Sequence, residues 1–422
     1  MQHAAHATPV LTIGNRRIGT GLEPYIIAEI GVNHDGDPSR ALALTDLAIA
    51  SNADAVKFQY FSADLLMARP PLRLVDVAGS ADGVAGGLLA AYQAAAGETD
   101  PHAMLRRLEL SLEVMAECIT RVHAAGRHAI VTVFSVPLVF HAAKLPWDAY
   151  KIASPDIVHR PLLEAVARLE KPIILSTGAA EFFEVQQALG WLDELGMPEN
   201  DNPTAADVRT RLALLQCVSS YPCALEVAAI GAISQLEMLH PIIGYSDHTT
   251  AVDTGAVAVG RGAVLLEKHL TDDRTRRGPD HAASLDGPDF LRYVALAKAA
   301  ARANCSMNGV EKGSDAAAAD VRIGSRRKVV QPCEADVRAV SRQSIVAIRN
   351  LPAGHVLSLM DLTFRRPGNG LAPFQVREVV GQVLRQDVQA HAALTAAVFA
   401  QETPVVRAVG RKAEAVGVAL PQ

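Results

Sequence analysis

The sequence predicts an α/β protein in which a parallel (β/α)8 barrel (TIM barrel) is followed by a small, mostly β domain. Short apolar runs alternate along the chain with longer segments of helical periodicity, and parallel strands require such crossover helices. Eight units of this kind fall within roughly 250 residues, the usual size of this barrel. The apolar runs cover residues 25–30, 53–58, 128–133, 149–152, 172–175, 212–217, 241–245 and 263–266.

An open, doubly wound sheet is the alternative architecture for the same alternation of strands and helices. That architecture is favoured when a Gly-rich phosphate loop follows the first strand. Here the first run leads into AEIGVNHDG, which lacks the GxGxxG pattern. The closed barrel is therefore the preferred prediction.

The domain boundaries follow from changes in composition. We expect the barrel to span residues 1–303, with an N-terminal hairpin that turns at Gly14-Asn15. Residues 304–323 are polar and rich in alanine, as in a linker, and residues 324–400 consist of short β-like segments and turns. The last residues, 401–422, are expected to form a loosely held tail.

A long insertion, at about residues 61–110, separates the second apolar run from the third. Loops of this length in a compact domain are usually either functional or disordered. Two interpretations therefore stay open: a flexible surface segment, or a lid over the carboxyl ends of the strands.

The overall composition limits the classes of partner. A formal net charge of −5 over 422 residues, without a basic run, gives no reason to expect nucleic acid or an anionic membrane as partner. The five cysteines are scattered and lack CxxC spacing, which favours a reduced, cytoplasmic protein. The N-terminus does not have the pattern of a signal peptide, and the most apolar stretch, residues 251–270, carries too many charges to span a bilayer.

Polar residues follow every one of the eight apolar runs. In a (β/α)8 barrel the chemistry lies at the carboxyl ends of the strands, so these residues are expected to meet around one mouth. In chain order they include Glu29, Lys57, Gln59, Thr132, Lys151, Ser154, Ser176, Ser219, Tyr221, Ser246, His248, Glu267 and His269.

Each of these residue types also has an ordinary structural use. A hydroxyl residue after a strand is often a turn former or helix cap, a strand lysine often pairs with a carboxylate, and a single histidine is more often hydrogen-bonded than metal-bound. The joint pattern is harder to explain in that way: two strand-end lysines, hydroxyls on three other strands and two strand-end histidines. Together they indicate an anionic, phosphate-bearing substrate beside a divalent cation.

Several segments at these strand ends resemble one known family. In order they are AEIGVNHDG, VKFQ, KIAS, ILSTGAA, LLQCVSSYP, GYSDHT and LLEKHLTDDRTRRGPDHAASLD, which cover most of residues 25–300. They resemble the sialic acid synthases (N-acetylneuraminate synthases) in order and spacing. The downstream SRQSIVAIRNLPAGHVL and FRRPGNGLAP are similar to that family's C-terminal SAF domain, which is antifreeze-like.

The resemblance implies an enzyme, a transferase that condenses phosphoenolpyruvate with N-acetylmannosamine or a related amino sugar and water. The products would be N-acetylneuraminate (sialic acid) and phosphate. Two alternatives stay open. A 6-deoxy diacetamido sugar as substrate would make the chain a legionaminate or pseudaminate synthase. A non-catalytic sugar- or ice-binding protein is suggested by the SAF-like domain alone, and the complete ring of polar residues counts against it.

The resemblance also implies roles for individual residues. Catalytic roles fall on Glu29, Lys57, Lys151, His248 and His269, and the two histidines would bind Mn²⁺ or Mg²⁺. Substrate-binding roles fall on Gln59, Thr132, Ser154, Ser176, Ser219, Tyr221, Ser246, Asp280 and Arg366. Glu29 is expected to transfer protons. Arg366 is expected to reach the site of the other subunit, which implies a domain-swapped homodimer.

The chain departs from the family pattern at a few positions near the sugar side and the phosphate shell. Asp156 stands where a glutamate is common, so the carboxylate is one methylene shorter. Val133 stands where the family often has proline, directly before Phe134, and Ser219 stands where it often has asparagine. These changes bear on the identity of the sugar more than on the reaction.

Overall fold

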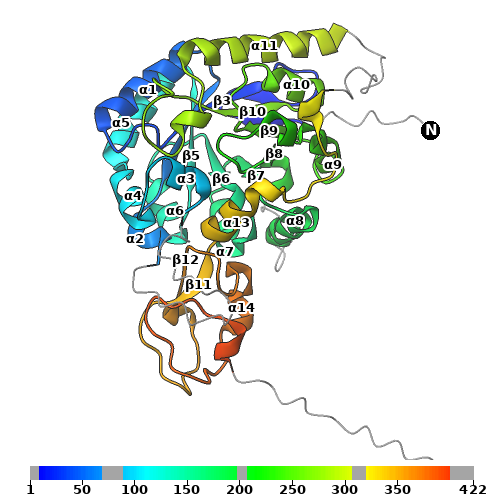
Figure 1. Ribbon diagram of the computed structural model, residues 1–422. Coiled ribbons are helices and arrows are strands. Elements are labelled where there is room, and N and C mark those ends of the chain that lie inside the picture. The colour runs from blue at the N-terminus through cyan, green and yellow to red at the C-terminus, as the bar shows by residue number, and fades with distance from the viewer. Residues whose placement is uncertain (1–8, 69–88, 197–206, 307–319, 400–422) are drawn as a thin grey trace, which may run out of the picture.

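The computed structural model describes residues 9–68, 89–196, 207–306 and 320–399. Eight parallel strands close into a barrel in the order β10-β3-β4-β5-β6-β7-β8-β9 (Figure 1), so the predicted architecture is confirmed. The strands are β3 (Tyr25–Gly31), β4 (Ala55–Tyr60), β5 (His128–Val133), β6 (Ala149–Ile152), β7 (Ile173–Ser176), β8 (Leu212–Cys217), β9 (Ile243–Asp247) and β10 (Leu265–His269).

Several strands extend further than the sequence predicts: β4 runs to Tyr60 and β7 to Ser176, while β9 and β10 run through the polar residues up to Asp247 and His269. For β9 and β10 the reason is the alternation of side chains along a strand. Asp247 and Lys268 face the outer helices, where Nζ of Lys268 lies 3.2 Å from Oδ1 of Asp247 and over the ring of Tyr293. Because the two charges pair with each other, the strands continue through them.

Helices cover the outside of the barrel. They are α1 (Pro38–Ala50), α5 (Leu112–Ala124), α6 (Val136–Ala142), α7 (Arg160–Ala167), α8 (Phe182–Gly196), α9 (Ile233–Leu236), α10 (Thr254–Gly260) and α11 (Gly287–Ser306). The sequence of α5 shows why such segments pack here: Met115, Cys118, Ile119 and Val122 recur at helical spacing and are buried in the main core. None of the described helices is long and apolar enough to cross a membrane.

A short antiparallel hairpin closes the amino-terminal end of the barrel. It consists of β1 (Leu11–Ile13) and β2 (Arg16–Ile18), whose apolar side chains are fully buried with those of the barrel interior. Gly14 makes the turn at φ +54°, a left-handed conformation in which a Cβ would also clash with the ring of His128. With this end plugged, the strands present their functional groups at the opposite, carboxyl end.

The insertion contributes three short helices at the mouth of the barrel. They are α2 (Ala63–Leu66), α3 (Ala91–Ala95) and α4 (Pro101–Arg107). The carboxylate of Glu109 accepts the N–H of Ala63 at 2.7 Å and so ties the end of the insertion to its start. Residues 69–88 lie outside the described part of the chain. The part that is described covers the strand ends, as in the second of the two interpretations.

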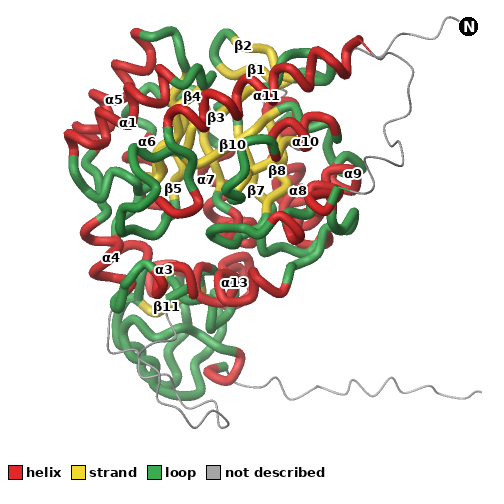
Figure 2. Tube along the Cα trace, turned by 45° about the horizontal axis from the view of Figure 1, so that its top comes forward, coloured by secondary structure: helices red, strands yellow, loops and turns green. Residues whose placement is uncertain are grey.

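After α11 the chain returns to the barrel and then forms a small domain of its own (Figure 2). α13 (Ala335–Ser341) lies beside α3, and its Val337 and Val340 pack on Ala90. The small domain contains an antiparallel pair, β11 (Ser344–Ala347) with β12 (Leu362–Arg365), and α14 (Val376–Val379). Its apolar core is built from residues 345–399. Most of the predicted linker, 304–323, and the tail 401–422 lie outside the described residues.

Glu184 of α8 fastens the returning segment to the barrel. Its carboxylate accepts hydrogen bonds from Nη1 of Arg338 and from Nη1 of Arg342, each at 2.8 Å. Burial would raise the pKa of Glu184, but the two guanidinium groups outweigh burial and hold that pKa at about 2. A carboxylate that is only 5 % exposed and paired twice contributes more to stability than a surface ion pair.

We expect Glu184→Gln to lower the free energy of unfolding at neutral pH by about 2 kcal/mol, because two arginines lose a buried charged partner. The folded-state pKa lies below the unfolded value of about 4.3, so the wild-type advantage should vanish as pH falls through about 4 toward about 2. Urea unfolding followed by circular dichroism measures both effects.

The matched control is Glu194→Gln on the same helix. The side chain of Glu194 pairs with Arg160 but is 60 % exposed, so this variant should lose less than about 0.5 kcal/mol. Equal losses in the two variants would show that Glu184 has no special part in holding the C-terminal region.

Candidate active site

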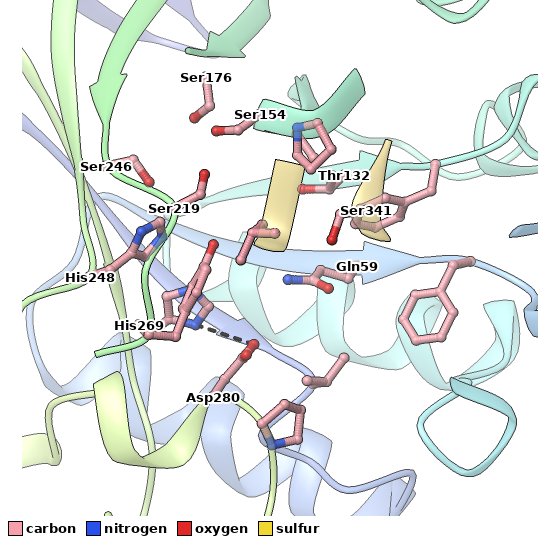
Figure 3. Close-up of a pocket in the computed structure, with 18 of the residues that line it drawn as sticks. Gln59, Thr132, Ser154, Ser176, Ser219, Ser246, His248, His269, Asp280 and Ser341 are labelled. Carbon is pink, nitrogen blue, oxygen red and sulfur yellow. Dashed lines mark ion pairs between the residues drawn. The ribbon is translucent and has the colours of Figure 1, made fainter. Parts of the chain in front are cut away.

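A pocket opens at the carboxyl ends of the barrel strands. Each of the eight strands, or the residue directly after it, contributes at least one side chain to the pocket lining. The insertion and the C-terminal region supply the roof. In Figure 3 the polar side chains from different strands converge on one space.

Thirteen of the fourteen predicted site residues line this pocket, from Lys57 on β4 to Arg366 in the small domain. The other one, Glu29, is fully buried next to the pocket, where it contacts Lys57 and accepts a hydrogen bond from Gln59 at 3.0 Å. Strand register brings the partners together, because Lys57 lies opposite Glu29 and Lys151 lies opposite Thr132. The predicted residues therefore form one cluster in space.

Two lysines and two glutamates form a buried charge cluster inside the barrel mouth. Nζ of Lys151 lies 3.0 Å from Oε1 of Glu267, and Nζ of Lys57 lies 3.5 Å from Oε2 of the same glutamate. Lys57 also pairs with Glu29 and donates a hydrogen bond to Oγ1 of Thr132 at 3.1 Å. Each lysine is thus paired with a carboxylate, as lysines in strands often are, and both lysines still line the pocket.

Burial and mutual attraction act on the members of this cluster in opposite directions. Burial would raise the pKa of Glu267, but Lys151 and Lys57 outweigh burial and hold that pKa below its usual range. Burial raises the pKa of Glu29, which Lys57 offsets only in part. Burial lowers the pKa of Lys151, whereas for Lys57 the two glutamates outweigh burial and raise the pKa. Glu267 is therefore the fixed anion, and Glu29 is the carboxylate that takes up a proton more readily.

Hydroxyl groups beside the lysines have free hydrogen-bonding capacity. Oγ of Ser176 and Oγ of Ser219 are buried without a hydrogen-bond partner among the residues that the structure describes. Ser154, in contrast, accepts the N–H of Gly178 at 3.0 Å, a contact that joins the segments after β6 and β7. A side chain at Gly178 would clash with the hydroxyls of Ser154 and Ser219, so glycine keeps this space open. Since buried polar groups are normally paired, the two free hydroxyls suit an anionic ligand.

His248 and His269 face each other at the ends of β9 and β10, with ring centroids 5.5 Å apart. Nδ1 of His248 lies 2.8 Å from the carbonyl of Val218 and donates to it, which leaves Nε2 as the ligand nitrogen. Nδ1 of His269 is buried and has no hydrogen-bond partner in the described part of the chain, and Oδ2 of Asp280 lies 3.7 Å away (Figure 3).

The number of protein groups that could bind a metal ion near His248 and His269 determines what kind of metal site they could form. Within the described ranges, no group of three or more His, Cys, Asp or Glu residues is arranged to hold a metal ion. The pair fits a divalent ion only as a two-nitrogen site, in which substrate and water complete the coordination. An open site of this kind belongs to catalysis, since structural sites are closed by four protein ligands.

An aromatic stack connects the histidines to the insertion. The ring of Tyr221 lies 4.1 Å from that of His248 and 4.8 Å from that of Tyr92 in α3, measured between centroids. Tyr92 is therefore a pocket residue, as is its neighbour Gln93. Because this contact joins two segments far apart in sequence, no local pattern reveals it.

Arg366 reaches the pocket from the small domain of the same chain. Its N–H donates to the carbonyl of Leu66 at 2.8 Å, and its own carbonyl accepts the N–H of Ala68 at 3.1 Å. Its guanidinium group lies 5.6 Å from the centroid of the Phe134 ring. The prediction placed this arginine in the other subunit's site. In this structure it completes the pocket of its own chain, because residues 320–341 dock on the same barrel.

Glu334, just before α13, holds two of the strand ends in place. Its Oε1 accepts the N–H of Ala179 after β7 and the N–H of Ser219 after β8, each at 2.6 Å. The side chain is fully buried. The C-terminal region thus supports the backbone that carries the pocket serines as well as covering them.

Glu267 is the main pocket residue to which the sequence-based prediction assigns no role. The available signal is the two-residue alternation along β10, which places Glu267 on the same face as His269. Leu105 of α4 and Ser341 of α13 are different, because only tertiary packing brings their helices over the pocket.

Known proteins are similar to this chain in sequence and in fold. The NeuB family profile matches residues 44–308, and the SAF domain profile matches residues 342–400. N,N'-diacetyllegionaminic acid synthase of Legionella pneumophila is 32% identical over 88% of this chain and 93% of its own. N-acetylneuraminate-9-phosphate synthase of Homo sapiens is 27% identical over 85% of this chain and 88% of its own. The crystal structure of the spore coat polysaccharide biosynthesis protein SpsE from Bacillus subtilis matches with a TM-score of 0.74 at 26% identity, covering 93% of this chain and 99% of that one.

Fold and pocket together define a (β/α)8 barrel enzyme with a capped, polar site at its carboxyl mouth. The chain belongs to the NeuB family, the sialic acid synthases that its sequence resembles, and it carries the SAF domain. It is therefore a synthase of the sialic acid and nonulosonic acid type.

Asp156, one of the departures from the family pattern, is fully buried below the small domain, where Nε2 of Gln343 donates to its Oδ1 at 3.0 Å. Burial raises the pKa of Asp156 to about 6, against the attraction of Arg366. In the unfolded chain the value is about 4. Folding therefore takes up a proton between about pH 4 and pH 6, and the contribution of Asp156 to stability falls as pH rises through that window.

We expect Asp156→Asn to remove this loss, because the amide keeps a hydrogen-bond acceptor for Gln343 and carries no charge. Relative to the wild type, the variant should gain on the order of 2 kcal/mol between about pH 4 and pH 6, measured by urea unfolding across that range. Asp46→Asn, at an exposed position of α1 where the carboxylate pairs with Arg121, is the control and should not show this gain. A profile of Asp156→Asn parallel to the wild type would contradict a raised pKa.

Proposed function

We propose that the protein condenses phosphoenolpyruvate with an N-acetylated amino sugar and water, giving a nine-carbon sugar acid and phosphate. The observation that carries this proposal is the convergence of two buried lysines, free serine hydroxyls and a histidine pair in one pocket. With N-acetylmannosamine the product is N-acetylneuraminate. With a 6-deoxy diacetamido sugar it is legionaminate or pseudaminate, and relatives are named for these products as well.

The polar part of the pocket suits phosphoenolpyruvate, which carries a phosphate and a carboxylate. Lys57 and Lys151 supply the positive charge, and hydroxyls donate hydrogen bonds around them. The hydroxyls are those of Thr132, Ser154, Ser176, Ser219 and Ser246, of which Ser176 and Ser219 have no hydrogen-bond partner among the described residues. Because Glu267 holds both lysines in place, the cationic groups are positioned before the substrate binds.

The amino sugar would lie beside the histidines, with Gln59, Tyr221, Asp280 and Arg366 around it. His248 and His269 would hold Mn²⁺ or Mg²⁺, which when bound polarises the sugar aldehyde. The methylene carbon of phosphoenolpyruvate joins the aldehyde carbon, and water replaces phosphate at the neighbouring carbon. Glu29, whose pKa burial raises, is the group proposed to move a proton at its carboxylate during these steps.

The test is phosphate release with phosphoenolpyruvate, Mn²⁺ and a panel of amino sugars, read together with the product mass. Lys151→Met should raise the Michaelis constant for phosphoenolpyruvate by roughly 10- to 100-fold, with a much smaller effect on that for the sugar. Lys144→Met, at an exposed position outside the pocket, is the control. An equal effect on both substrates would contradict the assignment of Lys151, and full turnover after exhaustive chelation would contradict the metal.

We also propose that the enzyme is a cytoplasmic homodimer in which the small domain is exchanged between subunits, with no nucleic acid or membrane as partner. The connection between α11 and Asp320 falls on residues 307–319, outside the described part. The segment after it docks through Glu184, Glu334 and Arg366. Exchange between subunits keeps each of these contacts and changes only which chain supplies it.

Mixed dimers test the exchange. Arg366→Ala and His269→Ala should each be inactive, but in an exchanged heterodimer one site carries both changes and the other carries neither. Equal mixing should then restore about a quarter of the wild-type activity, because half of the dimers are mixed and each has one intact site. The control mixes His248→Ala with His269→Ala, which share a barrel and restore nothing. Mixed dimers that form without activity, or an active monomer in sedimentation, would contradict the exchange.

A further inference from the structure

Part of the pocket lining is apolar, in contrast to the polar strand ends. Six apolar side chains, here called the apolar wall, form it: Phe61, Leu66, Met104, Leu105, Leu108 and Phe134. All six belong to one apolar cluster, and none is more than 9 % exposed. The wall is part of the packed structure and also a surface that a ligand in the pocket would touch.

The insertion builds most of the apolar wall, since only Phe134 comes from elsewhere. The rings of Phe61 and Phe134 meet edge to face with centroids 6.0 Å apart. The helices that carry the wall are held rigidly to each other, because Asp64 of α2 accepts a hydrogen bond from His102 at 2.9 Å and pairs with Arg106, both in α4. The shape of the wall is therefore set before a ligand binds.

The polar groups determine which end of a sugar meets this wall. The aldehyde carbon must lie near the histidines and lysines, because the new carbon–carbon bond forms there. Figure 3 shows His248 and His269 on one side of the pocket, with Thr132 and Ser341 on the other. Phe134 directly follows β5, which β3 and β4 separate from β10 and which β6, β7 and β8 separate from β9, so the wall lies on the side away from the histidines. The end of the sugar remote from the aldehyde is directed toward it.

We propose that the apolar wall selects an amino sugar whose terminal carbon is a methyl group, as in 6-deoxy N-acylated sugars, over one that ends in a hydroxymethyl group. This inference rests on the proposed function. A methyl group on the wall gains by leaving water, whereas a hydroxyl there loses its water and finds no hydrogen-bonding group among the six wall side chains. The guanidinium group of Arg366, 5.6 Å from the centroid of the Phe134 ring, is a polar group at the edge of the wall. The insertion is then the part of the chain that determines sugar specificity.

The same wall would also accommodate the methyl of an N-acetyl group, which both kinds of sugar carry. If that were its only occupant, the enzyme would not distinguish the two terminal groups. The experiment must therefore vary the terminal group alone.

The test compares 2-acetamido-2-deoxymannose with 2-acetamido-2,6-dideoxymannose, which differ only in the terminal hydroxyl, using phosphoenolpyruvate and Mn²⁺. We expect kcat/KM from phosphate release to favour the 6-deoxy sugar by about 10- to 100-fold, the range that an apolar pocket achieves against an added hydroxyl. Equal values, or a preference for the hydroxymethyl sugar, would overturn the inference and leave the proposed function intact. No phosphate release with any amino sugar would overturn the proposed function instead.

A matched pair of variants tests whether the wall is responsible. Met104→Gln places a hydrogen-bonding group on the wall, and we expect it to reduce the preference for the 6-deoxy sugar by roughly tenfold. Met67→Gln makes the same change in the same apolar cluster at a side chain that does not line the pocket, and the preference should not move. Leu105→Gln replaces the first variant if thermal unfolding shows that Met104→Gln does not fold. A preference that is unchanged in the wall variant, or equally changed in both, would overturn the assignment.

Discussion

Closure of the eight-stranded sheet is the constraint on which the rest of this molecule depends. Once β10 pairs with β3, all eight parallel strands end at the same mouth of the barrel. The inward-facing side chains near the carboxyl end of each strand must then share a single space. The N-terminal hairpin fills the opposite end with apolar groups. Polar residues that are scattered over 240 residues of sequence therefore meet because the sheet has no edge at which they could separate.

Placing four charges in this closed space has an energetic cost that their arrangement offsets. An isolated buried lysine would lose its proton, and an isolated buried glutamate would gain one. Glu267 pairs with both Lys57 and Lys151, which opposes the loss of their protons on burial, and both side chains still face the pocket. The two amino groups are thus held in position before a small dianion binds, which water alone would not provide.

The roof of the pocket is built differently from its strand ends. It is assembled from the insertion and the C-terminal region, which hold each other: Ala91 donates to Asp336 at 2.7 Å, and Arg366 pairs through its main chain with Leu66 and Ala68. Glu334 reaches past this roof to the backbone beside the pocket serines. The pocket is thus lined by strand-end residues on one side and by residues of two other parts of the chain on the other.

The sequence by itself determined the barrel, the order of its strands and the cluster of polar residues at their ends. It could do so because side-chain alternation and strand–helix periodicity are local, and the closed fold converts local position at a strand end into proximity. The roles of Lys57, His248 and Asp280 came from family resemblance, and the structure shows only that these residues meet.

Tertiary structure alone decided the rest. Asp247 and Lys268 belong to the strands because they pair on the outer face, a contact between β9 and β10 that no single segment encodes. Tyr92 and Met104 enter the pocket because helices of the insertion pack over the mouth, and Arg366 reaches the pocket because its main chain pairs with Leu66 and Ala68. Contacts between segments far apart in sequence depend on how surfaces fit, and that fit exists only once the chain has folded.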